Sequence, residues 1–475
     1  MTRYLAKPSE ALTKKFPFQP TRGQLQLFGL LDDFIPEKNK EKSTLLIKGY
    51  AGTGKTSVVT SLVKVLKYYN YKSLLMAPTG RAAKVMAQYA GRKAFTIHKI
   101  IYKVGPDDNE SLTFKRQKNY HRNTIFIVDE VSMVTDQAEF GTNSLLADLM
   151  WFVFEEPSNK LILIGDNAQL PPVGQQESPA LQLDHLLTNF ALHIESVEFT
   201  EVMRQEQHSG ILLNATNLRE KIRANQFEIH FKTRGFKDVF RMGNQKMEDG
   251  LRYAYDKFGI ENTIIICRSN KNAVAYNQFI RRTIHFYENE LEVGDYLMVV
   301  RNNYAVLPQE SQAGFLANGD FVEVMKVGLI EEMYGFRFAN LDLRLIDYPS
   351  EPVLQAKVLL NTLYSHSTAL SEQENRHLYR GVMEDYLDLA SKKERARALK
   401  SDPYLNAIQV KFAYALTCHK SQGGQWKVVF LDQGYLLKER IDKEYLRWLY
   451  TAVTRATQEL YLLNFNNEFF ENNKN

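Results

Sequence analysis

Short apolar runs separated by helical patterns fill the first third of the chain. The runs rich in Leu, Ile, Val or Phe are Ser43–Lys48, Ser73–Ala77, Thr124–Val128 and Lys160–Ile164. Each has the length of a buried strand, and a helix is expected between the first two, from about Ser57 to Tyr69. Buried strands that alternate with helices are typical of parallel sheets, so this part of the chain predicts an α/β domain.

A second set of apolar runs begins near Thr263. The expected strands are Thr263–Cys267, Val428–Leu431 and Leu460–Leu463, with a helix over Asn272–Arg282. Between these runs, Asp295–Gly328 alternates apolar and polar residues, which predicts a small β-barrel insertion. The charged stretch Ser371–Lys400 fits one amphipathic helix capped by Ser371. Alternation over Ile408–Tyr414 predicts one more strand.

Composition limits the classes of protein to consider. A chain of 475 residues is too long for one ordinary core and suggests two to four domains. The net charge of +5 permits a polyanionic partner without demanding one. Cys267 and Cys418 lie far apart, which argues against a disulfide framework or a zinc site. No apolar run resembles a signal peptide or a membrane span, so we expect a cytoplasmic protein.

The strongest chemical signal is a phosphate-binding loop, or P-loop, at Gly49–Thr56. Its sequence, GYAGTGKT, follows a predicted strand and precedes a predicted helix, as the motif requires. The backbone of Gly49, Ala51, Gly52, Thr53 and Gly54 can curl its N–H groups around phosphates at a helix N-terminus. Lys55 should reach the β- and γ-phosphates, and Thr56 should ligate Mg²⁺. The loop predicts ATP and Mg²⁺ as cofactors.

An acidic pair, Asp129 and Glu130, ends the predicted strand Thr124–Val128. Asp129 can hold the magnesium ion, and Glu130 is placed to polarise an attacking water as a general base. Together with the P-loop, the pair predicts hydrolysis of a nucleoside triphosphate. Kinases, GTPases and transporters share these two motifs, so they do not fix the class of enzyme.

Further motifs occur in the order and spacing of superfamily-one helicases, and the chain resembles the RecD/Dda branch of that family, which also includes Pif-like proteins. Pro20–Gln24 resembles the adenine-recognition motif, with Gln24 reading the base. Ala77–Lys84 resembles motif Ia, a DNA-backbone motif, and Thr96–His98 the DNA-contacting motif that follows it. Leu163–Gly174 is similar to motif III, with Gln169 directed at the γ-phosphate. The resemblance implies DNA contacts by Pro78, Thr79, Arg81, Thr96 and His98.

The C-terminal motifs complete the resemblance. Phe199–Gln205 resembles a segment that carries an arginine finger, here Arg204. Leu416–Trp426 resembles motif V, which implies that His419, Lys420, Ser421 and Gln422 contact DNA and that Gly424 lies at the nucleotide. Leu449–Ala456 resembles motif VI, with Arg455 as a second finger. Motif V departs mildly from the family, since Gly423–Gly424 stands where one Gly and a small polar residue are frequent.

The resemblance also implies a domain plan of two RecA-like parallel-sheet domains with two insertions. Residues 1–195 form the first domain, with a small β-hairpin, the strand-separating pin, at 100–123. Tyr102 and Phe114 are both candidates for its wedge. Residues 196–284 and 405–475 form the second domain. Residues 285–404 form an SH3-like β-barrel insertion, in which Asn303 lines the DNA channel, together with a helical arm.

The function implied by this family is an ATP-dependent DNA helicase that moves 5′→3′ on single-stranded DNA and unwinds duplexes. Two alternatives stay open: a RecD-like motor subunit of a recombination or repair complex, and a DNA-stimulated NTPase that is not a motor. The expected partners are single-stranded DNA and single-strand/duplex junctions. Single-strand-binding, replication or recombination proteins are possible further partners, and a monomer is expected.

Overall fold

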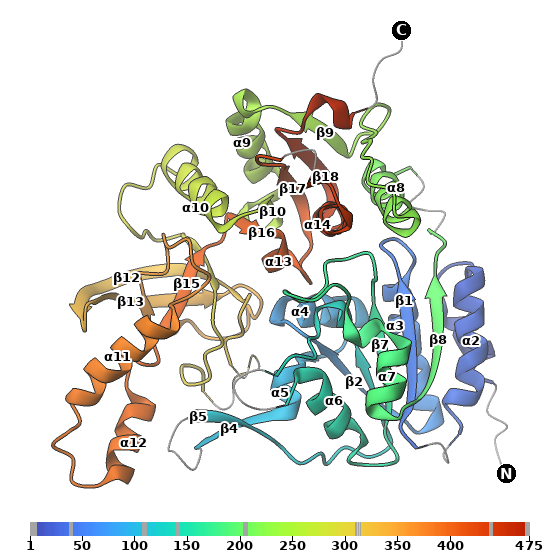
Figure 1. Ribbon diagram of the computed structural model, residues 1–475, viewed down its shortest axis with the longest axis horizontal. Coiled ribbons are helices and arrows are strands. Elements are labelled where there is room, and N and C mark those ends of the chain that lie inside the picture. Colours follow the sequence, from blue (N-terminus) through green and yellow to red (C-terminus); the bar gives the residue numbers. More distant parts are fainter. Residues whose placement is uncertain are drawn as a thin grey trace.

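The computed structural model describes residues 7–37, 41–106, 112–138, 143–202, 208–308, 311, 313, 315–436 and 440–470 (Figure 1). Its first sheet has six parallel strands in the order β3-β2-β6-β7-β1-β8. In chain order these are β1 (Ser43–Gly49), β2 (Lys72–Ala77), β3 (Ala94–Thr96), β6 (Thr124–Val128), β7 (Lys160–Gly165) and β8 (His193–Phe199). The strands predicted from the apolar runs of this region are therefore confirmed.

Helices cover both faces of this sheet. On one face are α1 (Pro8–Lys15), α2 (Arg22–Phe34), α3 (Lys55–Leu66) and α4 (Gly80–Ala90); on the other are α5 (Ile97–Ile101), α6 (Leu145–Phe154) and α7 (Leu183–Phe190). Alternate residues of the strands feed two separate apolar cores, one on each face. Helix α3 begins at Lys55, earlier than predicted, because the P-loop passes directly into its first turn.

The second sheet has five parallel strands in the order β16-β10-β17-β18-β9. They are β9 (Val239–Met242), β10 (Thr263–Cys267), β16 (Ala415–Thr417), β17 (Trp426–Asp432) and β18 (Ala456–Leu463). The helices of this domain are α8 (Gly210–Ala224), α9 (Met247–Phe258), α10 (Asn270–Phe279), α13 (Cys418–Ser421) and α14 (Lys443–Val453). The chain thus has the two parallel-sheet domains that the sequence predicts.

The predicted barrel is a closed barrel of five strands. It contains β11 (Tyr296–Val299), β12 (Phe321–Met333), β13 (Phe336–Leu345), β14 (Leu354–Leu359) and β15 (Ile408–Phe412). Its apolar residues and those of the second sheet form one continuous core. A buried ion pair of Arg281 with Asp295, at 2.7 Å, lies at the joint, where Tyr414 also donates to Asp295. The barrel is therefore built onto the second domain, whereas the first domain has its own cores.

Two strands cross the domain boundaries expected from the sequence. Strand β8 lies wholly in the first sheet and pairs with β1 along its length, although the expected boundary fell at 195/196. Strand β15 closes the barrel against β11 and β14, although the expected boundary placed residues from 405 onward in the second domain. Both differences arise from hydrogen-bond pairing between strands that are distant in sequence, which local patterns do not reveal.

The charged stretch 371–400 forms two helices, which corrects the prediction of one. Helix α11 (Glu372–Glu384) begins with a Ser371–Glu374 capping box. Helix α12 (Lys392–Ser401) begins with a second capping box, Ser391–Glu394. A Ser whose side chain accepts from the backbone N–H three residues on ends the preceding segment and starts a new helix. We call α11 and α12 the arm; they project from the barrel in Figure 1.

Strands β4 (Tyr102–Pro106) and β5 (Leu112–Arg116) pair as the antiparallel hairpin predicted for the pin. Tyr102 donates to Asp148 at 2.8 Å and packs against His98, so it anchors the base of the hairpin and is not a wedge. The side chain of Phe114 lies outside the described residues. In the described ranges, no helix combines the length and the apolar character needed to cross a bilayer.

Candidate nucleotide and DNA site

The P-loop connects β1 to α3 and is shaped by left-handed backbone at two glycines. Gly52 and Gly54 have φ of 74° and 80°, a region in which side chains are strained. Lys55 donates to the carbonyl oxygens of Gly49 and Tyr50 at 2.6 and 2.9 Å. The Thr56 hydroxyl is on an exposed residue. The loop thus has the curled backbone that suits phosphates, and the Lys55 ammonium is hydrogen-bonded to backbone carbonyls of the loop.

Gln24 is fully buried behind the loop. Its side chain accepts from Thr21 N–H at 3.0 Å, closing a capping box at the start of α2, and donates to Thr53 O at 3.0 Å. Gln24 therefore ties the predicted adenine motif to the P-loop. Its role as an adenine reader stays a prediction, because both ends of its amide are engaged in this state.

The acidic pair lies at the end of β6, next to the P-loop. Tyr89 of α4 donates to Asp129 at 2.5 Å, and the Glu130 N–H donates to the same carboxylate at 2.8 Å. Burial, followed by the neighbouring Glu130, raises the pKa of the Asp129 carboxyl. Glu130 has a left-handed backbone, with φ of 53°, that turns its side chain out of the strand direction. Burial disfavours the charged form of this carboxyl, so a bound cation would stabilise it.

The loop after β7 carries the residues predicted for motif III. Asp166 is buried, and burial raises the pKa of its carboxyl. Gln169 is also buried, and its Oε1 has no hydrogen-bond partner within the described ranges. A buried acceptor without a donor is costly, so this oxygen suits a water or ligand that donates to it.

Tyr450 of α14 crosses from the second domain into this cleft. Its hydroxyl donates to Asp166 at 2.6 Å and accepts from the Ala51 N–H of the P-loop at 2.9 Å. The same side chain thus joins the P-loop, motif III and motif VI. Tyr450 lies in the segment that resembles motif VI, but the sequence alone assigns it no role, because a Tyr in an apolar helix is usually a core residue.

Other groups of the second domain hold the motif III loop. The Leu170 N–H donates to Thr451 Oγ1 at 2.9 Å, and Gln422 donates to Leu170 O at 2.8 Å. Arg447 donates to Gln176 O at 2.5 Å. Residues of motifs V and VI therefore hydrogen-bond to the backbone of the motif III loop in the first domain.

Of the two predicted arginine fingers, only Arg455 lies in the described part of the chain, and in this state its side chain bonds within its own domain. Arg455 is buried and donates to Thr451 O at 3.0 Å and to Gly424 O at 3.2 Å, both in its own domain. The role of Arg455 as a finger therefore stays a prediction, and the bond to Gly424 O places Gly424 against Arg455. Arg204 lies outside the described residues.

The predicted DNA contact Arg81 lies against two aromatic rings. Its guanidinium is 4.4 Å from the ring centre of Phe321 in the barrel and 4.4 Å from that of Trp426 in the second domain. The two ring centres are 6.4 Å apart, so the rings meet the guanidinium from adjacent directions. In this state Arg81 joins three parts of the molecule, and its contact with DNA stays a prediction.

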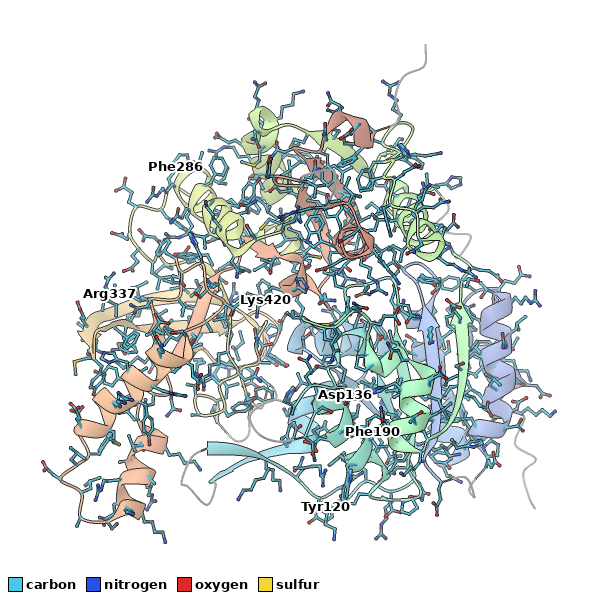
Figure 2. All side chains as sticks on the ribbon, viewed as in Figure 1. Tyr120, Asp136, Phe190, Phe286, Arg337 and Lys420 are labelled. Atoms are coloured by element: carbon cyan, nitrogen blue, oxygen red, sulfur yellow. The ribbon has the colours of Figure 1, made fainter. Side chains whose placement is uncertain are left out.

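The barrel also covers the start of α4. Lys84 pairs with Asp347 at 2.7 Å, and a Cβ placed on Gly80 would lie 2.0 Å from Asp320 Oδ1. Asp320 is 3% exposed, and burial together with Asp347 raises its pKa to about 8. Lys420 of motif V donates to Asn318 at 2.7 Å; Figure 2 shows Lys420 where the barrel meets the two domains. We call the contact of barrel residues 317–321 and 347 with α4 and Lys420 the barrel junction.

Several other predicted DNA contacts have structural roles here. The hydroxyls of Thr79 and Thr96 cap α4 and α5. Ser421 is fully buried and donates to Cys418 O, so it cannot reach DNA in this state. Asn303 donates to Asn406 O and accepts from the Ala305 N–H, so it braces the barrel domain in this state, and its place in the DNA channel stays a prediction.

The remaining DNA-motif residues differ in exposure. Pro78 and His98 are half-buried, and burial lowers the pKa of His98 to about 4, which keeps it neutral. His419 is exposed beside Lys420. Of the four motif V residues predicted to contact DNA, His419 is the one that is exposed.

Two family models match the chain. Residues 35–175 match the AAA domain, and residues 412–463 match the UvrD-like helicase C-terminal domain. The first match spans the P-loop, the acidic pair and motif III. The second spans motifs V and VI.

Curated relatives cover the chain to different extents. An uncharacterized protein of Acanthamoeba polyphaga mimivirus is 25% identical over 93% of this chain and 98% of its own length. The ATP-dependent DNA helicase Dda of Enterobacteria phage T4 is 27% identical over 59% of this chain and 60% of Dda. The ATP-dependent RecD2 DNA helicase of Deinococcus radiodurans is 29% identical over 37% of this chain and 21% of RecD2.

Among solved structures, a Pif1 helicase from Bacteroides in complex with ADP-AlF3 and ssDNA aligns with 96% of this chain and 95% of that chain, at 15% identity and a TM-score of 0.46.

Proposed function

We propose that this chain, which belongs to the Dda/RecD/Pif-like branch of the superfamily-one helicases, is an ATP-dependent DNA helicase that moves 5′→3′ on single-stranded DNA and unwinds duplexes. The observation that carries the proposal is the cleft in which Tyr450 of one domain contacts both the P-loop and Asp166 of the other. A nucleotide bound there touches both domains, so its turnover changes how they meet. The names of Dda and RecD2 support DNA as the substrate.

ATP binds with its phosphates in the P-loop in this proposal. The N–H groups of Gly52, Thr53, Gly54 and Lys55 and the dipole of α3 face the phosphates. Lys55 leaves the carbonyls of Gly49 and Tyr50 for the β- and γ-phosphates. Gln24 lies behind the loop, where the adenine-recognition motif predicts the base.

Thr56 and Asp129 are the residues that hold Mg²⁺. Thr56 is an exposed residue in the first turn of α3, and Asp129 directly follows strand β6 of the same sheet. The raised pKa of Asp129 fits a cation site, because burial and the neighbouring Glu130 disfavour its charged form and a cation would offset both. The ion supplies charge neutralisation at the phosphate oxygens.

Glu130 and Gln169 act on the attacking water. Glu130 follows Asp129 directly and accepts the proton that the water loses. The unpartnered Oε1 of Gln169 accepts a hydrogen bond from the same water and so orients it. Arg455 and Arg204 neutralise charge on the transferred phosphoryl group, which requires Arg455 to release Gly424 O as the cleft closes.

The same movement exposes the DNA-binding surface. The barrel shares one continuous core with the second domain, so a rotation of that domain against the first carries the barrel with it. Pro78, Thr79, Arg81, Thr96 and His98 then meet the strand from one side, and the His419–Gln422 segment meets it from the other. In this proposal DNA enters when the barrel junction separates.

An unwinding assay tests the proposal directly. Purified protein is given ATP, Mg²⁺ and duplexes with either a 5′ or a 3′ single-stranded tail, and ATP turnover is measured with and without single-stranded DNA. We expect turnover to rise with DNA and only the 5′-tailed duplex to unwind. Unwinding from the 3′ tail alone refutes the direction.

Two further outcomes address the alternatives. DNA-independent turnover without unwinding favours a non-motor NTPase. DNA-stimulated turnover without unwinding, restored by added protein subunits, favours a motor subunit of a larger complex. Gel filtration of the active protein tests whether it acts as a monomer.

A further inference from the structure

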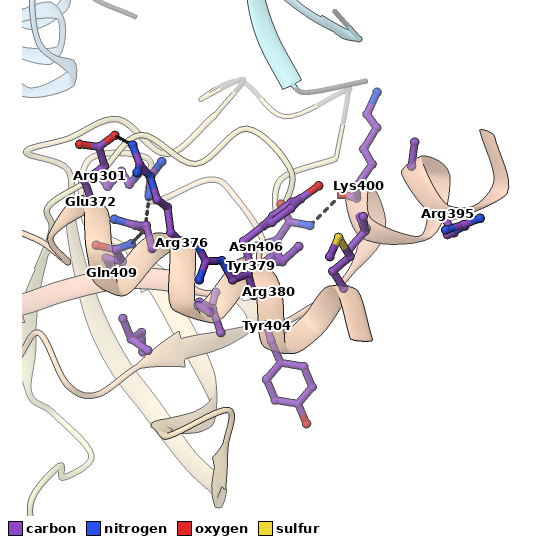
Figure 3. A pocket seen from close by; sticks show the side chains of 18 of the residues that line it. Arg301, Glu372, Arg376, Tyr379, Arg380, Arg395, Lys400, Tyr404, Asn406 and Gln409 are labelled. Atoms are coloured by element: carbon purple, nitrogen blue, oxygen red, sulfur yellow. Dashed lines mark hydrogen bonds and ion pairs between the residues drawn. The ribbon is translucent and has the colours of Figure 1, made fainter. Parts of the chain in front are cut away.

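The arm and the barrel enclose a cavity of about 640 Å³ that neither the nucleotide nor the tracking strand uses in the proposal above. Arg301, Arg376, Arg380, Lys392, Arg395 and Lys400 line it, and Glu372 is the acid among its lining residues (Figure 3). Like charges gathered in one concave site repel one another, less so where solvent screens them, and an anion between them relieves the repulsion. A cavity with this lining suits a negatively charged ligand.

Two acids at the ends of the arm helices have partners away from the cavity cations. Asp385, which follows α11, accepts from Tyr334 of the barrel, and Asp402, which follows α12, accepts from Tyr386 at 3.0 Å. The Tyr334 contact seats the arm on the barrel, where Leu378 and Val382 also join a small apolar cluster. The Tyr386 contact ties the end of α12 to the segment between the two helices.

Most of the cations lack a partner within the described part of the chain. Arg301 donates to Asn375, and Arg376 pairs with Glu372. No acid pairs with Arg380, Lys392, Arg395 or Lys400 in the described ranges. The Nε–H of Arg395 is buried and has no acceptor there. A buried guanidinium donor without an acceptor indicates a missing oxygen ligand.

Helix α12 divides its cations between the cavity and the outside. Lys392, Arg395 and Lys400 line the cavity, whereas Lys393 and Arg397 of the same helix do not. Lys392 and Arg395, three residues apart, share one face of the helix, and Lys393 and Arg397, four residues apart, share another. Tyr379, which is 47% exposed, lies in the same cavity and offers a ring on which a base can stack.

We infer that the arm cavity is a second nucleic-acid site, which binds the phosphates and a base of a single strand. The ligand is the strand displaced from a fork, and this identification rests on the proposed helicase function. In the view of Figure 1 the β4–β5 hairpin points toward the arm. In this inference, a strand separated at the hairpin passes on to the arm. Cations on both walls and one stacking ring suit a single strand better than the wide, regular backbone of a duplex.

A pair of matched double variants tests the site. Lys392→Gln with Arg395→Gln removes two cavity cations, and Lys393→Gln with Arg397→Gln removes the same residue types from the outer face of the same helix. Fluorescence anisotropy without ATP measures affinity for a fork with two single-stranded arms and for a 5′-tailed duplex that lacks the displaced arm. Both substrates are titrated over a range of salt concentrations.

We expect the cavity variant to bind the fork about tenfold more weakly, with a salt slope lower by about 1.4, since each phosphate contact of a single strand contributes about 0.7. The 5′-tailed duplex should bind with unchanged affinity, and the outer-face variant should behave as wild type. If Arg395→Lys replaces Arg395→Gln in the cavity variant, the charge at this position is kept, and part of the affinity for the fork should return. Melting followed by circular dichroism checks that the arm stays folded.

Other results overturn the inference. Equal losses in the two double variants mean that general charge, and not the cavity, attracts DNA. Equal losses on both substrates assign the cavity to the tracking strand or the duplex. Unchanged DNA binding with weaker binding of a poly-glutamate peptide assigns it to an acidic protein. Because these assays use no ATP, failure of the proposed motor activity shows separately in turnover and unwinding.

Discussion

The nucleotide cleft and the barrel junction join the same two parts of the molecule, but they treat their buried acids differently. In the cleft, Asp166 accepts from Tyr450 and from the Ala168 N–H, and Asp129 accepts from Tyr89 and the Glu130 N–H. At the junction, Oδ1 of Asp320 and Oδ2 of Asp347 are buried without a hydrogen-bond partner in the described ranges.

This difference indicates that the barrel junction separates more easily than the nucleotide cleft. Each unsatisfied buried acceptor costs about 1–3 kcal/mol, so the junction holds together less firmly than its many contacts suggest. The cleft has hydrogen bonds on both of its carboxylates and keeps its geometry before a nucleotide arrives. A stable cleft beside a weak junction suits a protein that binds ATP in a fixed site and admits DNA by opening.

The largest expected effect tests the cleft through Lys55. Lys55→Ala removes the cation that neutralises the β- and γ-phosphates, so we expect ATP turnover to fall by about 10²–10³-fold. Binding of single-stranded DNA should persist, since Lys55 lies away from the junction. Steady-state turnover with saturating DNA is the measurement, and near-normal turnover contradicts the assignment of the P-loop.

The next effect tests how firmly Tyr450 holds the two domains. Tyr450→Phe leaves Asp166 Oδ2 without its donor, so the first transition in urea unfolding should lose about 1–3 kcal/mol. Tyr445→Phe on the same helix is the control, because its hydroxyl has no partner from the first domain in the described ranges. Equal losses in both variants argue against a special role for Tyr450.

A smaller effect in the opposite direction tests the junction. Asp347→Asn with Asn318→Ala removes the ion pair to Lys84 and the hydrogen bond to Lys420. We expect single-stranded DNA to bind about threefold to tenfold more tightly, because less interaction opposes opening. Asp342→Asn with Asn318→Ala controls for the lost charge. Weaker or unchanged binding by the first variant relative to this control contradicts the idea that the barrel must move.

The smallest effect is a pH dependence from Asp320. Its pKa is about 8 in the closed junction and returns to its ordinary value near 4 when the junction opens or the chain unfolds. Closing of the barrel junction therefore takes up a proton on Asp320. The contribution of this protonation to the stability of the closed form declines as pH rises from about 4 to about 8. The groups facing Asp320 include Asp347, whose partner is Lys84.

DNA affinity should accordingly rise with pH relative to Asp320→Asn, which cannot titrate. We expect a change of several-fold between pH 6 and pH 8, measured as the ratio of the two affinities so that effects of other groups cancel. A flat ratio shows that Asp320 does not titrate with opening.

Local sequence patterns predicted much of the fold and of the nucleotide site. The runs Thr124–Val128 and Thr263–Cys267 are strands with those bounds, because continuous apolar residues are stable only when buried on both faces of a sheet. The P-loop and the acidic pair were identifiable since their chemistry depends on residues adjacent in sequence. The arm was mispredicted as one helix although Ser391 and Glu394 form a recognisable capping box.

The sequence by itself determined the strands, the phosphate loop, the acidic pair and the order of the motifs, since these depend on neighbouring residues and on periodic burial. Only the tertiary structure decided that Tyr450 enters the cleft, that Arg455 faces its own domain, and that Arg81 lies against Phe321 and Trp426. Each of these arises where chain segments distant in sequence meet. Their geometry is set by the packing of two domains and a barrel, which no local pattern encodes.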